Sequence, residues 1–332
     1  MKKRLILCLV AVLLGAGVFG WYIHLTLTTP GPSYTQPVVV LIPHGVQLRT
    51  IVRGLVAEGV LTNDWVFSWW ARLTKADRKI KSGEYEFIDP LSPLELLRRL
   101  TQGESRRLIV TVTEAKKVKE IAAILADKGL GTAESFLCLN TDPAFLDRWG
   151  LPPQGMEGYL FPDTYYLSRS AMPEEILGKM IKRFYHVFTR AMYRTADHLN
   201  MSPHEVVTLA SLVEKETGAA SERPLVSAVF HNRLKKRMLL QCDPTVIYGV
   251  ENFDGNLTLL HLRTPPPYNT YVISGLPPGP IANPGLQSLL ATLTPANSPY
   301  LYFVGKGDGT HEFSSDLASH NRAVQQFQKR RS

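Results

Sequence analysis

Two acidic residues at the end of a well-marked helix are the strongest candidates for chemistry in the sequence. The helix is predicted to begin at Ser202-Pro-His-Glu205, where a Ser cap precedes Pro at the first helical position and Glu at the third. It is predicted to run to Thr217 and to end at Gly218. At about 100° per residue, Glu214 and Glu216 lie on opposite flanks of the apolar stripe, so we expect both carboxyl groups beside the core.

A carboxyl group at such an edge loses part of its hydration. Partial desolvation raises the pKa of a carboxyl group and keeps some of it protonated near neutral pH, which is the property that a general acid needs. The helical wheel does not choose between Glu214 and Glu216. An ordinary solvated helix surface is the alternative interpretation of both residues.

No metal or cofactor site is predicted. His204-Glu205-Val-Val-Thr208 resembles the first half of a zinc-protease helix, but Thr208 stands where the second His would be. The three cysteines form no CxxC pair and have no zinc-like spacing with His, which also excludes a disulfide scaffold. One bridge between Cys138 and Cys242 remains open, beside the alternative of two buried free thiols.

The start of the chain predicts a membrane segment. Lys2-Lys-Arg4 precedes nineteen uncharged residues, Leu5 to Ile23, which would cover about 28 Å as a helix. Positive charges before such a segment favour a cytoplasmic N-terminus. We therefore expect a cytoplasmic tail at 1–4 and a transmembrane helix at 5–25, with the rest outside; a cleaved signal peptide is the alternative.

After a Pro-rich linker at 26–37, a strand, turn and helix unit occurs twice. The first copy has its strand at Val38–Ile42, and the second has its strand at Leu108–Val112. Gly45 in the first turn corresponds to Ala115 in the second, so only the first copy keeps a glycine turn. Between the copies, helices at 65–73 and 93–100 and a strand at 83–87 are predicted.

These patterns predict an α+β chain with two parts, a small module at 38–132 and a second domain at 133–332. The second domain contains a Pro-, Gly- and Asn-rich region between 242 and 299, whose loops are expected to be shaped for binding. Near its end, 305–309 is predicted to be the turn of a hairpin.

The charge of the chain limits the classes of partner that it could bind. Lys and Arg number 37 against 29 Asp and Glu, a net charge of +8, but there is no dense basic run with interleaved aromatic residues. A nucleic-acid partner is therefore not expected. Anionic lipid and an acidic cell-wall polymer are both compatible with this charge.

A series of motifs follows in order along the second domain. They are Glu157-Gly-Tyr-Leu-Phe-Pro-Asp-Thr-Tyr165, Leu209-Ala-Ser-Leu-Val-Glu-Lys-Glu-Thr217, Phe230-His-Asn-Arg-Leu234, Leu240-Gln-Cys-Asp-Pro-Thr-Val-Ile-Tyr-Gly249, Tyr268-Asn-Thr-Tyr271, Gly275-Leu-Pro-Pro-Gly-Pro-Ile-Ala-Asn-Pro284, Pro299-Tyr-Leu-Tyr-Phe-Val304 and Ala318-Ser-His-Asn321. Together they resemble the endolytic murein transglycosylases (MltG, or YceG-like), and the resemblance covers the whole chain. Cys242, where a small hydroxyl residue is expected, and Ala115 are departures.

The resemblance implies a lyase anchored in the inner membrane, with a LysM-like first module and a periplasmic mixed α/β catalytic domain of YceG-like type. It implies cleavage of the MurNAc-GlcNAc β-1,4 bond within nascent peptidoglycan strands, leaving 1,6-anhydroMurNAc ends and using no cofactor. Glu216 matches the family's general acid and base, and Glu214 is the second choice or a supporting residue. Peptidoglycan and the membrane are the implied partners, and proteins of cell-wall synthesis are compatible ones.

Under this resemblance, the loops after the helix supply candidate sugar-binding residues, because amides, hydroxyls and aromatic rings suit sugar hydroxyls and N-acetyl groups. They are Gln241, Asp243, Thr245, Tyr248, Tyr268, Asn269, Thr270 and Tyr271. Core packing is the alternative for Tyr248 and Tyr271, and a turn or cap is the alternative for Asn269 and Asp243.

Two other functions remain open. A membrane-anchored glycan-binding scaffold would need no acid, whereas a hydrolytic muramidase would need a second carboxylate facing Glu216. Asp243 is the candidate for that second carboxylate.

Overall fold

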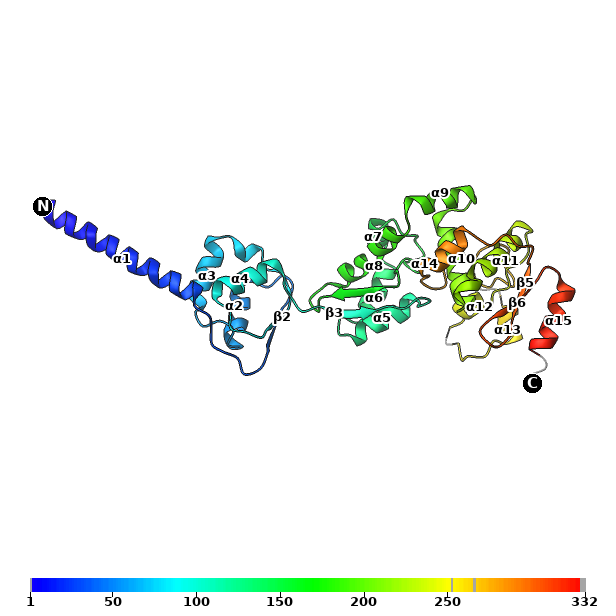
Figure 1. The fold of residues 1–332 in the computed structure, drawn as a ribbon, viewed down its shortest axis with the longest axis horizontal. Coiled ribbons are helices and arrows are strands. Elements are labelled where there is room, and N and C mark those ends of the chain that lie inside the picture. The colour runs from blue at the N-terminus through cyan, green and yellow to red at the C-terminus, as the bar shows by residue number, and fades with distance from the viewer. Residues whose placement is uncertain (1, 252, 265–266, 329–332) are drawn as a thin grey trace. The chain divides into compact units, whose positions relative to one another are not determined.

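The chain folds into two compact units, which are described one at a time. The computed structural model describes residues 2–251, 253–264 and 267–328, without the side chains of 2–5 (Figure 1). The first unit is Met1–Ile109 with Tyr166–Met172, and the second is Val110–Tyr165 with Pro173–Ser332. Met1 of the expected tail at 1–4 lies outside the described residues. This division differs from the expected boundary at 132/133, because the second strand and helix unit packs with the C-terminal part of the chain.

The N-terminal helix α1 spans Lys2–Thr28 (Figure 1). Within the described residues, its segment Ile6–Thr28 is the one helix long and apolar enough to cross a membrane, with a mean hydropathy of 2.3. Most of its apolar side chains are exposed, whereas Ile23 and Leu27 are buried against Val66 of the first unit. This helix fits a single-pass membrane anchor.

The rest of the first unit is a two-stranded sheet packed with helices. The antiparallel strands are β1 (Val38–Ile42) and β2 (Gly83–Phe87). The helices are α2 (Leu48–Ala57), α3 (Asp64–Leu73), the 3-10 helix η1 (Ala76–Arg78) and α4 (Pro93–Gln102). Alternate strand residues such as Val40 and Tyr85 enter one apolar core with Leu55 and Leu96. The predicted helices and strands of this region are confirmed.

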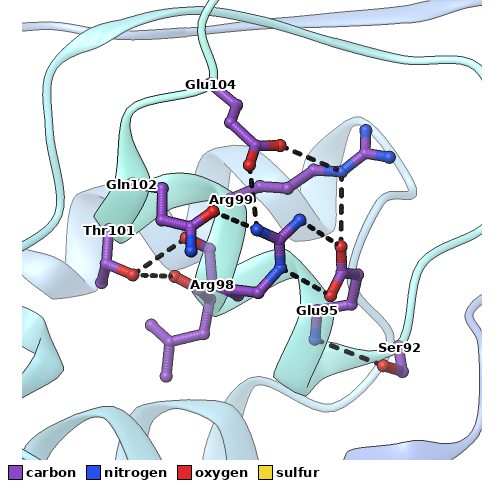
Figure 2. A network of polar contacts seen from close by, with 8 residues as sticks. Ser92, Glu95, Arg98, Arg99, Thr101, Gln102 and Glu104 are labelled. Atoms are coloured by element: carbon purple, nitrogen blue, oxygen red, sulfur yellow. Dashed lines mark hydrogen bonds and ion pairs between the residues drawn. The ribbon is translucent and has the colours of Figure 1, made fainter.

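The surface of α4 carries a network of charged side chains (Figure 2). Ser92 caps the helix by accepting a hydrogen bond from the Glu95 N–H at 3.3 Å. Arg98 donates to Glu95 at 2.7 Å and to Glu104 at 2.9 Å, and it also bonds Gln102. Because these side chains are largely exposed, solvent screens the ion pairs and each contributes little to stability. The network therefore orders the helix surface, while the apolar core holds the unit together.

The second strand and helix copy consists of β3 (Leu108–Thr111) and α5 (Val118–Asp127), and β3 pairs with β4 (Thr164–Leu167). Its turn has the same left-handed conformation as the first copy, with φ of 74° at Gly45 and 64° at Ala115. A side chain in this region costs about 1–2 kcal/mol. The second copy has lost the glycine and kept the turn.

Helices make up most of the second unit. Its remaining helices are α6 (Ala133–Asn140), α7 (Pro143–Arg148), α8 (Pro173–Val187), α9 (Arg190–His198), α10 (Pro203–Glu216), the 3-10 helix η2 (Ala220–Glu222), α11 (Arg223–Lys235), α12 (Asp243–Gly249), α13 (Leu259–Arg263), α14 (Leu286–Leu293) and α15 (Leu317–Phe327). The helices α10, α11 and α14 pack on one another (Figure 1).

The predicted hairpin is confirmed as β5 (Tyr302–Gly305) and β6 (His311–Ser314), which pair antiparallel. The expected α+β class is therefore confirmed, although the described part of the second unit is a helical body with small β elements. All three cysteines are free, with Cys138 exposed and Cys242 buried.

Candidate active site at the end of helix α10

Helix α10 begins as the sequence predicts. Ser202 accepts a hydrogen bond from the Glu205 N–H at 3.2 Å, and the Glu205 carboxylate accepts one from the Ser202 N–H at 2.8 Å. From Val206 to Glu214 every residue is buried, so the helix runs through the centre of the unit. The first and last turns of the helix reach the surface, and the last turn carries the two candidate acids.

Glu214 is buried and fully engaged with other protein groups. Its Oε1 accepts a hydrogen bond from Arg223 Nη2 at 3.1 Å, and its Oε2 accepts one from the Gly285 backbone N–H at 2.9 Å. The Arg223 guanidinium also lies 3.6 Å from the Glu114 carboxylate. Glu214 therefore ties the end of α10 to the first residue of α11 and to the residue before α14.

We call residues 283–285 the brace segment, because other contacts fix it from a distant part of the chain. The Ala115 N–H donates to the Asn283 carbonyl at 3.1 Å, and the Asn283 N–H donates to the Lys116 carbonyl at 2.9 Å. A Cβ on Gly285 would lie 1.9 Å from Glu114 Oε1, so a larger residue there would displace the Glu114 side chain. The left-handed turn at Ala115 thus holds the segment on which Glu214 rests.

Glu216, in contrast, opens on a pocket. It is the last residue of α10, is half-buried, and lines a cavity of ≈ 380 Å³. The polar residues that share this cavity are Arg233, Gln241, Asp243, Tyr271, His311, His320 and Gln328. The two acids therefore differ in environment: Glu214 is a structural ion-pair partner and Glu216 faces an open, polar hollow.

The surroundings of Glu216 adjust its proton affinity. Burial raises the pKa of Glu216 from 4.5 to about 7, and the nearby Asp243 carboxylate adds to this rise. A hydrogen bond with the Cys242 thiol and the charge of Arg233 act in the opposite direction and lower the pKa. Burial and the same carboxyl raise the pKa of the Cys242 thiol, which keeps it a neutral donor. A carboxyl group in this state can both donate and accept a proton at neutral pH.

Three of the eight predicted sugar-binding residues line the Glu216 cavity. Gln241 and Asp243 enter it from the chain before and at the start of α12, and Tyr271 enters from the following loop. The Tyr271 hydroxyl donates to Asp243 Oδ1 at 2.5 Å, and Gln241 Oε1 accepts from Arg233 at 3.3 Å. This pairing positions the amide, the phenol and the carboxylate around one opening.

Three other predicted residues are buried inside the loops and hold them together. Thr245 and Thr270 bond through their hydroxyls at 2.9 Å, and Thr270 Oγ1 also accepts from the Cys242 N–H at 3.0 Å. The Asn269 amide donates to three loop carbonyls, the closest being that of Thr264 at 2.7 Å. These side chains position Cys242 and Tyr271 for the cavity.

The last two predicted residues, Tyr248 and Tyr268, lie beside Glu157, a half-buried acid that stands in a noted motif but was not predicted as a site residue. Their rings lie 4.8 Å apart, and the Tyr248 hydroxyl donates to Glu157 Oε2 at 3.3 Å. Glu157 also accepts from Asn283 Nδ2 at 3.0 Å and from the Val118 N–H at 3.1 Å. Burial raises the pKa of Glu157 to about 7, and these hydrogen bonds oppose the rise. The sugar-binding role of the two tyrosines stays a prediction.

The sequence analysis also missed several residues of the Glu216 cavity, among them Arg233 and His320. Arg233 is buried and donates to the Leu301 carbonyl at 2.7 Å and to the Leu240 carbonyl at 2.9 Å. His320 stacks on Tyr302 at 5.1 Å, and its Nδ1 is buried without a partner. Both residues stand inside motifs already noted, Phe230–Leu234 and Ala318–Asn321, but their spacing from Glu216 gave no sign of contact.

Comparison with known proteins identifies the family of the chain. The model of the YceG-like family matches residues 40–326. A Bacillus subtilis (strain 168) protein named endolytic murein transglycosylase is 30% identical over 305 residues, which cover 86% of this chain and 83% of that protein. A protein of the same name from Streptococcus pneumoniae serotype 2 is 28% identical, and the match covers 96% of this chain and 63% of the longer relative.

A solved structure leads to the same family. The crystal structure of a yceG-like protein from Listeria monocytogenes has a TM-score of 0.60 and 28% sequence identity to this chain. The match covers 87% of this chain and 99% of the Listeria chain. Since the family model spans almost all of the chain after helix α1, the chain belongs to the YceG-like family.

Proposed function

We propose that this protein is an endolytic murein transglycosylase, a lyase of peptidoglycan, and that Glu216 is its single catalytic acid and base. The observation that carries the proposal is a half-buried carboxyl group on a polar cavity, with a pKa raised to about 7. Such a group is close to half protonated at neutral pH. The names of the bacillary and streptococcal relatives support the substrate and the type of reaction.

The proposed reaction needs one carboxyl group. Glu216 protonates the oxygen that bridges C1 of MurNAc and C4 of GlcNAc, and the C1–O bond breaks. The resulting carboxylate takes the proton of the C6 hydroxyl on the same muramoyl residue, and O6 forms the new bond to C1. Attack within one sugar replaces a bimolecular step. The product is a 1,6-anhydroMurNAc end, and Glu216 is protonated again.

The neighbours of Glu216 have separate proposed roles. Asp243 and Arg233 act on the pKa of Glu216 in opposite directions, and together they keep it near neutral. Gln241 and Tyr271 offer an amide and a phenol to sugar hydroxyls and the N-acetyl group. Glu214 has no free oxygen to offer, because Arg223 and the brace segment occupy both.

A hydrolytic muramidase is the second candidate, and one observation favours it. Asp243 lines the same cavity as Glu216 and could be the second carboxylate that a hydrolase needs. The hydrogen bond that the Tyr271 hydroxyl donates to Asp243 Oδ1 fixes the orientation of this carboxyl group. The chemistry of the product ends distinguishes the two reactions, because a lyase leaves anhydro ends and a hydrolase leaves reducing ends.

We further propose that α1 holds the protein in the inner membrane as a single span. The positive residues Lys2, Lys3 and Arg4 favour a cytoplasmic N-terminus, which would put both units in the periplasm. The exposed apolar surface of α1 supports the anchor. The LysM-like character of residues 38–132 and partnership with proteins of cell-wall synthesis stay predictions.

The test uses the full chain in detergent, isolated glycan strands, and mass spectrometry of the digest. We expect the wild type to release anhydro ends, and Glu216→Gln to release none while still sedimenting with the strands. Asp243→Asn should still give anhydro ends, at a changed rate. Glu214→Gln removes the neighbouring carboxylate, which does not line the cavity, and it should still give anhydro ends below its lowered Tm, because its effect is on stability.

Three results would contradict the proposal. Cleavage by Glu216→Gln would rule out Glu216 as the catalytic acid. Reducing ends that vanish in Asp243→Asn would favour the hydrolase. Intact strands with wild-type protein would leave a glycan-binding scaffold as the remaining function.

A further inference from the structure

Helix α3 of the first unit has a large apolar face that is only partly covered. Trp65, Trp69 and Leu73 are spaced four residues apart, so they lie on one face of the helix. Their exposed fractions are 53%, 39% and 59%. The opposite face is buried through Val66 and Phe67. The helix is thus fixed to the unit on one side and presents aromatic rings on the other.

This face is continuous with the end of the membrane helix. The Trp65 ring lies 6.4 Å from that of Phe19 in α1, and Trp69 stacks on Trp65 at 6.5 Å. The first turn of α3 is also fixed there, because Asn63, its cap, donates to the Tyr22 hydroxyl at 3.3 Å. These contacts set the height of α3 along α1.

That height places the exposed face at the membrane surface. A hydrocarbon core of about 30 Å takes about 20 helical residues, which run from Leu5 to about His24. Phe19 then lies about 7 Å inside the outer edge of the core. Trp65 is level with Phe19, and interfacial helices bury their apolar faces about 5–10 Å into the boundary.

The charges near α3 complement an anionic surface. Arg72, Lys75, Arg78 and Lys79 are exposed within eight residues at the end of α3 and in η1. A shallow hollow of ≈ 380 Å³ lies between the aromatic and basic side chains, lined by Trp65, Trp69, Arg72 and Leu73 among others. Basic side chains attract anionic lipid headgroups, and Trp rings favour the interface between headgroups and acyl chains.

We propose that α3 is a second membrane contact, which docks its Trp65–Trp69–Leu73 face into the outer leaflet of the bilayer beside α1. The proposal rests on the membrane anchorage by α1 proposed above. Docking by α3 gives the first unit a second contact with the bilayer, beside α1. The first unit is then held at the bilayer at a fixed tilt.

The test uses single-tryptophan variants of the full chain, in which the other four of Trp21, Trp65, Trp69, Trp70 and Trp149 are replaced by Phe. Each variant is reconstituted into bilayers of phosphatidylcholine and phosphatidylglycerol, with or without acyl-brominated lipid, which quenches tryptophan on contact. We expect the Trp69-only protein to be quenched to an extent similar to the Trp21-only protein. The Trp149-only protein, whose ring packs inside the second unit against Phe145, should not be quenched.

A charge variant provides an independent measurement. Arg72→Glu with Lys75→Glu, made in the Trp69-only protein, should reduce quenching in bilayers that contain phosphatidylglycerol. Arg107→Glu, at another exposed site of the same unit, is the matched control and should not. Circular dichroism checks that each variant is folded.

The outcomes separate the two proposals. Quenching of Trp21 without quenching of Trp69 would overturn docking and leave the anchor intact. Absence of quenching at both positions would overturn the anchor, and docking with it. A Trp69 that is unquenched and blue-shifted in a cross-linkable dimer would assign the face to a second copy of the chain, which also overturns docking to lipid.

Discussion

The proton held by Glu216 should make the second unit less stable as the pH rises. The pKa of Glu216 is about 7 in the folded protein, against 4.5 for an ordinary Glu. A raised folded-state pKa means that the folded protein binds this proton more tightly than the unfolded chain. The associated stability is fully present below about pH 4.5 and is lost as the pH rises through about 7.

The size of this effect follows from the rise in pKa. From 4.5 to about 7 it corresponds to about 3 kcal/mol, at about 1.4 kcal/mol per pH unit. Because Glu216 is half-buried and opens on the cavity, solvent screens part of this energy, and we take about 2 kcal/mol. For a unit of this size, that is about 4–8 °C in Tm.

The perturbation is Glu216→Gln, which removes the titration and keeps the shape of the side chain. We expect the Tm of the variant, relative to wild type, to increase by about 4–8 °C between pH 4 and pH 8. Differential scanning fluorimetry of the full chain in detergent measures it. Glu157, whose pKa is also raised to about 7, titrates in both proteins and cancels in the difference. A Tm difference that stays the same at every pH would refute the reasoning, because it would mean that Glu216 titrates like an exposed carboxyl group.

Three further predictions concern single groups around the site. Ala115→Gly should raise the Tm, since it removes about 1–2 kcal/mol of backbone strain and adds about 0.5–1 kcal/mol of unfolded-chain entropy; an unchanged or lower Tm would contradict the strained turn. Glu214→Gln should destabilise the protein by about 3 kcal/mol, because it leaves Arg223 buried with only a distant carboxylate partner, whereas the double variant with Arg223→Met should recover part of the loss in a thermal melt. Cys242→Ala should move the profile of kcat against pH to higher pH, because the thiol hydrogen bond lowers the pKa of Glu216. A profile that moves to lower pH would mean that the thiol raises this pKa.

Local patterns predicted the elements well. The capping residues at Ser202–Glu205 predicted where α10 begins, and the Gly-rich 305–309 predicted the turn between β5 and β6. A helix start and a tight turn each depend on residues that are neighbours in the sequence, so both can be predicted from the sequence alone. The same holds for the strand and helix copies, whose apolar spacing predicts them directly.

The site depended on contacts that local patterns do not contain. The helical wheel put Glu214 and Glu216 at equivalent edges, and the difference comes from Arg223 and Gly285, which reach only Glu214. Arg233 stands in a noted motif, but its place beside Glu216 follows from the packing of α11 on α10. For Asn269 the sequence left two interpretations open, sugar binding and a turn. Its buried amide donates to carbonyls that only the folded loop brings together.

The brace segment links the acid to the point where the chain enters the second unit. Ala115 lies five residues after Val110, where that unit begins, and it bonds Asn283, while Gly285 bonds the side chain of Glu214 two positions before Glu216. A displacement of the turn at Ala115 would therefore reach Glu214 through the backbone of 283–285, and Glu214 lies in the same helical turn as Glu216.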